Sequence, residues 1–156
     1  MKSKKKNIIL FLLIVAMLVV GFYRDFLFKN INALMQAWDA DMDYQMPSSL
    51  NFLKNYEYNT LSWFKWVLTV AFSVIYLLIS IVVVRLFFNE KIYSRITIIT
   101  FCGVLLLSLF FMLMGYVFKG GATGMYSIAR YLMGMAQSPV LLMILVPAFK
   151  LSKKDQ

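Results

Sequence analysis

The chain has 156 residues, of which 62% are hydrophobic and 17% aromatic, and its formal net charge is +9. Soluble domains are about 45–50% apolar, so this excess indicates a membrane protein and argues against a soluble domain. Because the chain contains no histidine and only one cysteine, Cys102, it cannot form an internal disulfide, a serine–histidine or cysteine–histidine pair, or a histidine-based zinc site.

The first predicted element is a membrane span over residues 7–23, preceded by a run of lysines at positions 4–6. The span is short for a crossing, which takes about 20 residues, but tilt and flanking aromatic side chains can make up the difference. A lysine-rich start before an apolar core also resembles a secretory signal. No small-residue cleavage site follows, and the chain stays bulky at "FYRDFLF", so we favour an uncleaved anchor.

Residues 24–65 form the predicted outer loop, which begins with an amphipathic pattern. Apolar residues recur there at helical spacing, and Asn30 falls on the other side of the helical wheel. The recurring residues are Leu27, Ile31, Leu34, Met35 and Trp38. We therefore expect an amphipathic helix that lies in the outer interface or extends the first span. It would act as a packing lid or as a docking surface for a partner.

The same loop carries five of the seven acidic residues of the chain. They are Asp25, Asp39, Asp41, Asp43 and Glu57. The stretch "DADMDYQMPSSL" suggests a calcium loop, but an EF-hand needs glycine at its sixth position and glutamate at its twelfth, where this chain has Tyr44 and Leu50. We therefore predict no metal site.

The second and third predicted spans cover residues 66–88 and 96–118, and each has a stripe of small or polar residues. The stripes are Thr69, Ser73, Tyr76 and Ser80 in the second span, and Thr97, Thr100, Ser108 and Gly115 in the third. Such residues let transmembrane helices approach closely and form hydrogen bonds across the contact. We interpret them, and Cys102, as packing residues; the alternative is a groove that binds lipid or a small molecule.

Basic residues indicate the orientation. They cluster before the first span, in the turn of residues 89–95, and after the fourth span at residues 150–154. With four spans these three regions share one side, so both termini are predicted to be cytoplasmic. Next to long apolar runs, such clusters indicate contact with anionic membrane lipids and argue against nucleic-acid binding.

The fourth predicted span, residues 125–149, combines apolar and polar residues. Its polar residues fall within about 100° on an ideal helix. They are Ser127, Arg130, Gly134, Gln137 and Ser138. Gly134 and Ser138 form a small-xxx-small pair that can admit another backbone. Pro139 predicts a kink, which would leave the carbonyl of Met135 without its usual donor; Pro147 repeats this disturbance near the cytoplasmic end.

Arg130 is the unusual charge of this span. An intramembrane arginine on a bundle face usually pairs, yet none of the four predicted spans contains a carboxylate. One interpretation is that Arg130, close to the outer end of the span, snorkels to the lipid headgroups. The other is that it pairs, in which case its counter-charge must come from Asp39, Asp41 or Asp43, from a lipid phosphate, or from another protein. The lack of buried titratable groups also argues against a proton-coupled transporter.

The last span also supports a family resemblance. Arg130, followed by "QSP" at 137–139, "LLMILVPAF" at 141–149 and a basic tail, resembles the ending of exosortase F system-associated proteins. These small bacterial membrane proteins are encoded beside an exosortase, a transpeptidase-like membrane enzyme that processes C-terminal sorting signals. The resemblance implies an accessory role and supplies no catalytic residue.

The expected fold is all-α: a four-helix transmembrane bundle with an amphipathic helix in the outer loop, residues 1–156 forming one integral membrane domain. The expected function is that of a non-enzymatic accessory subunit of an exosortase-type system in the bacterial inner membrane. It would contact the enzyme or its substrate through the outer loop and the polar face of the last span, without a cofactor. The alternative is a lipid- or small-molecule-binding protein with a groove between spans.

Overall fold

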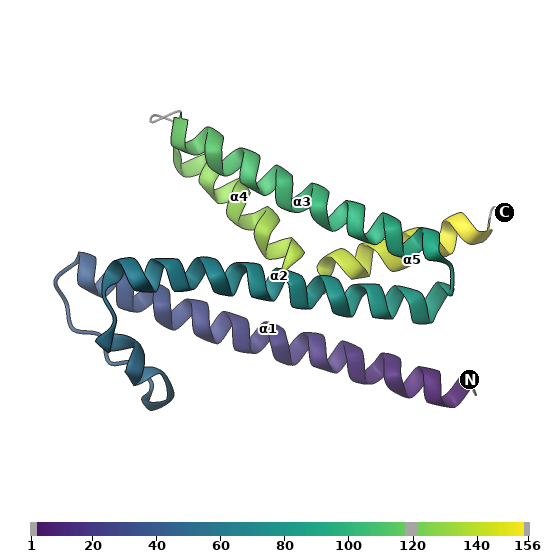
Figure 1. Cartoon of the computed structure of the whole chain (residues 1–156), viewed down its shortest axis with the longest axis horizontal. Helices are drawn as coiled ribbons and strands as arrows, with labels where there is room; N and C mark the ends of the chain where they lie inside the picture. The colour runs from purple at the N-terminus through teal and green to yellow at the C-terminus, as the bar shows by residue number, and fades with distance from the viewer. Residues whose placement is uncertain (1–2, 118–121, 155–156) are drawn as a thin grey trace. The chain divides into compact units, whose positions relative to one another are not determined.

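The computed structural model describes residues 3–117 and 122–154, and Figure 1 shows that this part of the chain is helical. The elements are α1 (Ser3–Asp39), the 3-10 helix η1 (Ser48–Asn55), α2 (Tyr58–Phe88), α3 (Lys91–Val117), α4 (Ala122–Ala136) and α5 (Val140–Lys154). No strand occurs within these described ranges. The predicted all-α class is confirmed.

Three of these helices, α1, α2 and α3, are long and apolar enough to cross a membrane. Helices α4 and α5 are separated by a short break and bent by 63° relative to each other, and they provide a fourth span if the bent pair counts as one. The chain therefore fits a multi-pass membrane protein with three or four spans. The last residue of the predicted third span, residue 118, lies outside the described residues.

Helix α1 runs without interruption from Ser3 to Asp39. Its 37 residues measure about 55 Å at a rise of 1.5 Å per residue, which exceeds the roughly 30 Å of a hydrocarbon core. The segment with the amphipathic pattern therefore belongs to the same helix as the first predicted span. The helix ends in a Schellman arrangement, in which Met42 donates its backbone N–H to the carbonyl of Ala37 at 2.8 Å.

The chain divides into two compact units, and helices α1 and α2 each contribute to both. One unit, here called the outer unit, consists of Val19–Phe72; the other, called the main unit, consists of Met1–Leu18 and Ser73–Gln156. Each unit is described below by itself.

The outer unit has its own apolar core, in which η1 packs against parts of α1 and α2. The core residues are Leu27, Ile31, Leu34, Met35, Leu50, Leu53, Leu61 and Phe72. Ring pairs Phe28–Phe72 and Trp38–Tyr58, each with centroids 6.3 Å apart, hold α1 against α2. The predicted loop is thus a packed helical segment, whose apolar stripe on α1 is buried as the helical spacing predicts.

Asn30 contradicts the sequence interpretation, which placed it away from the apolar face. It is buried, its amide donates to the carbonyl of Phe26 at 2.7 Å, and its side-chain oxygen accepts a 3.0 Å hydrogen bond from the Tyr44 hydroxyl. A buried amide is tolerated when its polar atoms are bonded. Asn30 therefore connects α1 to the segment that follows it.

In the main unit, α3 and α4 pack through small residues. Ser108 of α3 donates its hydroxyl to the backbone carbonyl of Ala129 in α4 at 2.8 Å. Gly115, Ala129 and Ala136 are buried as well. Because a short side chain reaches the neighbouring backbone directly, the two helices must approach closely at this level. The predicted packing role of Ser108 and Gly115 is confirmed.

Candidate functional site

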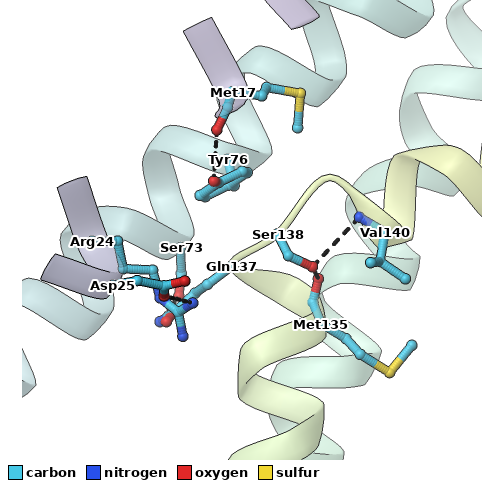
Figure 2. Close-up of polar contacts among 9 residues, drawn as sticks. All are labelled: Met17, Arg24, Asp25, Ser73, Tyr76, Met135, Gln137, Ser138 and Val140. Atoms are coloured by element: carbon cyan, nitrogen blue, oxygen red, sulfur yellow. Dashed lines mark hydrogen bonds and ion pairs between the residues drawn. The ribbon is translucent and has the colours of Figure 1, made fainter. Parts of the chain in front are cut away.

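The break between α4 and α5 is the most distinctive feature of the main unit (Figure 2). Pro139 has no N–H to donate to the carbonyl of Met135. The Ser138 hydroxyl donates to that carbonyl instead, at 3.0 Å. The same oxygen accepts the N–H of Val140 at 3.4 Å, so Ser138 caps the start of α5, and Pro139 directly precedes the first residue of that helix.

The structure confirms the kink predicted at Pro139, with a bend of 63°. The carbonyl of Met135, predicted to be left without a donor, is satisfied by Ser138. Because α4 ends at Ala136, Gly134 and Ser138 do not lie on one continuous helix and do not form the predicted small-xxx-small pair. Pro147 behaves differently from Pro139, since α5 continues through it.

Gln137 lies at the break and is almost completely buried. Its side-chain amide donates a 2.9 Å hydrogen bond to the hydroxyl of Ser73 on α2, which is also buried. Figure 2 shows the Gln137 side chain reaching from the break to Ser73. Two polar residues that the sequence assigns to stripes of different spans therefore meet, as the packing interpretation expects.

Tyr76, one helical turn beyond Ser73, extends this buried polar contact within the main unit. Its ring is fully buried, and its hydroxyl donates to the backbone carbonyl of Met17 in α1 at 2.8 Å (Figure 2). The stripe on α2 thus contacts both the beginning of the chain and the α4–α5 break. Ser73 and Tyr76 thus join segments that are far apart in the sequence.

Arg130 differs from these buried and hydrogen-bonded side chains. It is exposed, and within residues 3–117 and 122–154 it has no ion pair, hydrogen bond or ring contact. It lies eight residues after Ala122, or about 12 Å along α4, and directly follows Ala129, which contacts Ser108 near the middle of α3. Its side chain therefore leaves α4 more than two turns after the helix start.

The surface of α4 next to Arg130 is open. A Cβ atom added to Gly134, one turn further along, would have no atom within 4 Å beyond its own local helix. Tyr131 beside it is 78% exposed. The predicted stripe therefore divides, because Gln137 is buried at the break while Ser127 and Arg130 are exposed. Arg130 and Gly134 define what we call the open face of α4.

The predicted acidic candidates belong to the outer unit and are all exposed. Asp43 pairs with Lys54 at 3.5 Å. Asp41, two residues after the end of α1, adopts a left-handed backbone conformation with φ of 52°. Asp39 is the last residue of α1. Their proposed pairing with Arg130 remains a prediction.

Besides Asn30, the residues Cys102 and Ser80 show where sequence reasoning does not reach the structure. Cys102, interpreted as a packing residue, is exposed, so that interpretation is wrong. The buried hydroxyl of Ser80 lies on the predicted stripe but has no hydrogen-bond partner among the described residues. The spacing of the stripe predicts burial of Ser80 and cannot tell which hydroxyls find acceptors.

The site described above offers hydrogen-bonding groups at the break and the exposed guanidinium of Arg130. Among the described residues, no three histidine, cysteine, aspartate or glutamate side chains are grouped so that they could hold a metal ion. Comparisons with family models, with curated proteins and with solved structures find no match. The functional proposal therefore rests on the residues of the chain itself.

Proposed function

We propose that this chain is a non-enzymatic accessory subunit of a membrane protein complex and that its partner contacts the open face of α4. The observation that supports this proposal is that Arg130 is exposed and has no partner in the described part of the chain. A charge inside a span is costly unless it is paired or reaches water, and intramembrane arginines usually mark contacts with a counter-charge. A carboxylate on a neighbouring transmembrane helix would supply that charge.

Gly134 favours a protein partner over lipid alone. The open space beside it allows a second helix backbone to come close, which increases van der Waals contact between helices in a membrane. The neighbouring Tyr131 offers a large exposed ring for the same contact. A small residue one turn from an unpaired arginine thus suits a helix that carries an acidic side chain.

The partner we propose is an exosortase-type enzyme of the bacterial inner membrane. This identity is supported by the resemblance of residues 130–149 and the basic tail to the ending of exosortase F system-associated proteins. The distribution of lysine and arginine supports cytoplasmic termini, with the outer unit on the opposite side. In that orientation the outer unit, with Asp39, Asp41 and Asp43, provides a second contact for the enzyme or its substrate.

The alternative function, a lipid- or small-molecule-binding groove between spans, has less support. Two of the buried polar side chains that could line such a groove form hydrogen bonds inside the main unit, since Gln137 bonds to Ser73 and Ser108 bonds to the Ala129 carbonyl. Their arrangement is typical of helix packing.

The test is co-purification of the tagged chain with a co-expressed exosortase-type enzyme of the same organism in mild detergent. We expect Arg130→Ala to reduce recovery of the enzyme at least about tenfold, as loss of a paired intramembrane charge predicts, and Arg130→Lys to reduce it less. Arg85→Ala, which removes an exposed arginine near the end of α2, is the matched control. Equal recovery with Arg130→Ala and wild type, at equal protein level, would refute the proposed contact.

A further inference from the structure

A cluster of three aromatic rings brings three helix ends together in the main unit. The ring centroid of Tyr93, at the start of α3, lies 4.8 Å from that of Phe88 at the end of α2 and 4.9 Å from that of Phe149 in α5. Phe88 and Phe149 meet edge to face at 5.7 Å. All three residues are buried. The last turns of α2 and α5 and the first turn of α3 therefore share one end of the unit.

That end carries most of the positive charge of the described main unit. The basic residues near the triad are Arg85, Lys91, Arg95 and Lys150, all exposed. The lysines at positions 4–6 lie near the same level. Met17 contacts Tyr76, and from this contact α1 extends back to Lys6 and α2 extends forward to Phe88 over similar lengths of about 17 Å. Figure 1 shows that the two helices are antiparallel. Glu90 is the single described carboxylate at this end.

The basic residues are arranged around the beginning of α3. Lys91 and Arg95 are four residues apart and therefore lie on the same face of its first turns. Free backbone N–H groups at a helix start and its positive dipole end attract anions. Lys150 directly follows Phe149, whose ring touches Tyr93, so it lies beside the same turn.

Exposed apolar side chains accompany these cations. Phe87 is 44% exposed, Ile92 58% and Leu151 66%, and each is next to or near one of the basic residues. A free anion or a nucleic acid gains nothing from such neighbours. A phospholipid has both a charged headgroup and acyl chains, so it matches cations and apolar side chains placed side by side.

We propose that this end of the main unit is a binding site for anionic phospholipid. Lys91, Arg95 and Lys150 hold the phosphate of the headgroup, and Phe87, Ile92 and Leu151 contact the upper acyl chains. The aromatic triad keeps the three helix ends in place for this contact. The site is independent of the proposed enzyme partner, because it lies on other residues than the open face of α4.

The test uses purified chain in detergent with added phosphatidylglycerol or phosphatidylcholine. Bound lipid is measured by native mass spectrometry, and stability by the midpoint of thermal unfolding. We expect phosphatidylglycerol to be retained and to raise the midpoint, and the variant Lys91→Gln/Arg95→Gln/Lys150→Gln to retain it at least about tenfold less. The matched control, Lys29→Gln/Lys54→Gln/Lys65→Gln, removes the same charge from the outer unit and should retain it like wild type.

A second variant keeps the charges and changes the apolar neighbours. Ile92→Ser/Leu151→Ser should also weaken retention of phosphatidylglycerol, whereas binding of glycerol phosphate would be unaffected. Equal retention of the two lipids, or wild-type retention in the triple glutamine variant, would overturn the proposal. So would an equal rise of the unfolding midpoint with glycerol phosphate alone, which would identify a free-phosphate site instead.

Discussion

The side-chain amide of Gln137 and the hydroxyl of Ser73 form a buried hydrogen bond of 2.9 Å between residues 64 positions apart. Gln137 occupies the break between α4 and α5, and Ser73 lies on α2. The contact connects the break in the last helix pair to the middle of a long span. The energetic contribution of this hydrogen bond can be separated from that of burial, because α2 also contains a buried serine, Ser80, whose hydroxyl has no hydrogen-bond partner within the described ranges.

Ser73→Ala should lower the free energy of unfolding by about 1 kcal/mol, since it leaves the Gln137 amide buried with one donor bond fewer. Ser80→Ala is the matched control: the Ser80 hydroxyl is buried without a hydrogen-bond partner among the described residues, so its removal should be neutral or stabilising. Unfolding of the purified chain in mixed micelles by denaturant gives both values. Equal losses for the two substitutions would mean that the Gln137–Ser73 bond contributes nothing beyond packing.

The bend between α4 and α5 should depend on Pro139. Pro139→Ala restores the N–H that can bond to the Met135 carbonyl, so we expect α4 and α5 to become a straighter, continuous helix. Spin labels at the exposed positions Tyr126 and Ile144, in a Cys102→Ser background, report this as an increased distance. Pro147→Ala is the control, because α5 already continues through Pro147. An unchanged distance in Pro139→Ala would show that the bend depends on packing and not on the missing donor.

Ser138 makes its own contribution to stability at the break between α4 and α5. Ser138→Ala removes both the donor to Met135 and the cap of Val140, and it should lower the free energy of unfolding by about 1 kcal/mol. Ser138→Asn, which keeps a capping oxygen, should recover part of that loss. Denaturant unfolding of the two variants measures the difference, and equal stability of Ser138→Ala and wild type would contradict the capping role.

Some parts of this structure can be predicted from the sequence, because a strong local sequence pattern marks each of them. The long apolar runs predict the spans, Pro139 predicts the break, and the spacing of Ser73, Tyr76 and Ser80 predicts one buried face. Each of these is a local pattern with a single structural meaning.

The pairings within the fold could not be predicted in the same way. The stripes define helix faces but not which hydroxyl meets which acceptor, so Ser73 could not be matched to Gln137. Asn30 is buried because Tyr44 folds back onto it from an irregular segment without periodicity. Cys102 lies in a span whose residues are mostly apolar, so residue type alone does not distinguish a lipid-facing position from a packed one.

The end of α1 offers a test in the outer unit. Asp41 has a φ of 52°, a conformation that is costly for residues with a Cβ and that glycine adopts freely. Asp41→Gly should therefore raise the free energy of unfolding by about 0.5 kcal/mol. Asp39→Gly, which places glycine inside the last turn of α1, should lower it by a similar amount. If both substitutions lower the free energy of unfolding, the Asp41 side chain stabilises the fold by more than its backbone conformation costs.

The close approach of α3 and α4 predicts a sharp size limit at Ala129. Its carbonyl accepts the Ser108 hydroxyl at 2.8 Å and its side chain is buried, so no room remains for a larger residue. Ala129→Leu should separate the helices, break that hydrogen bond and lower the free energy of unfolding by about 1–3 kcal/mol. Ile128→Leu, at an exposed neighbouring position, should have almost no effect. If Ala129→Leu unfolds at the same denaturant concentration as wild type, the two helices do not pack as closely as the Ser108 contact requires.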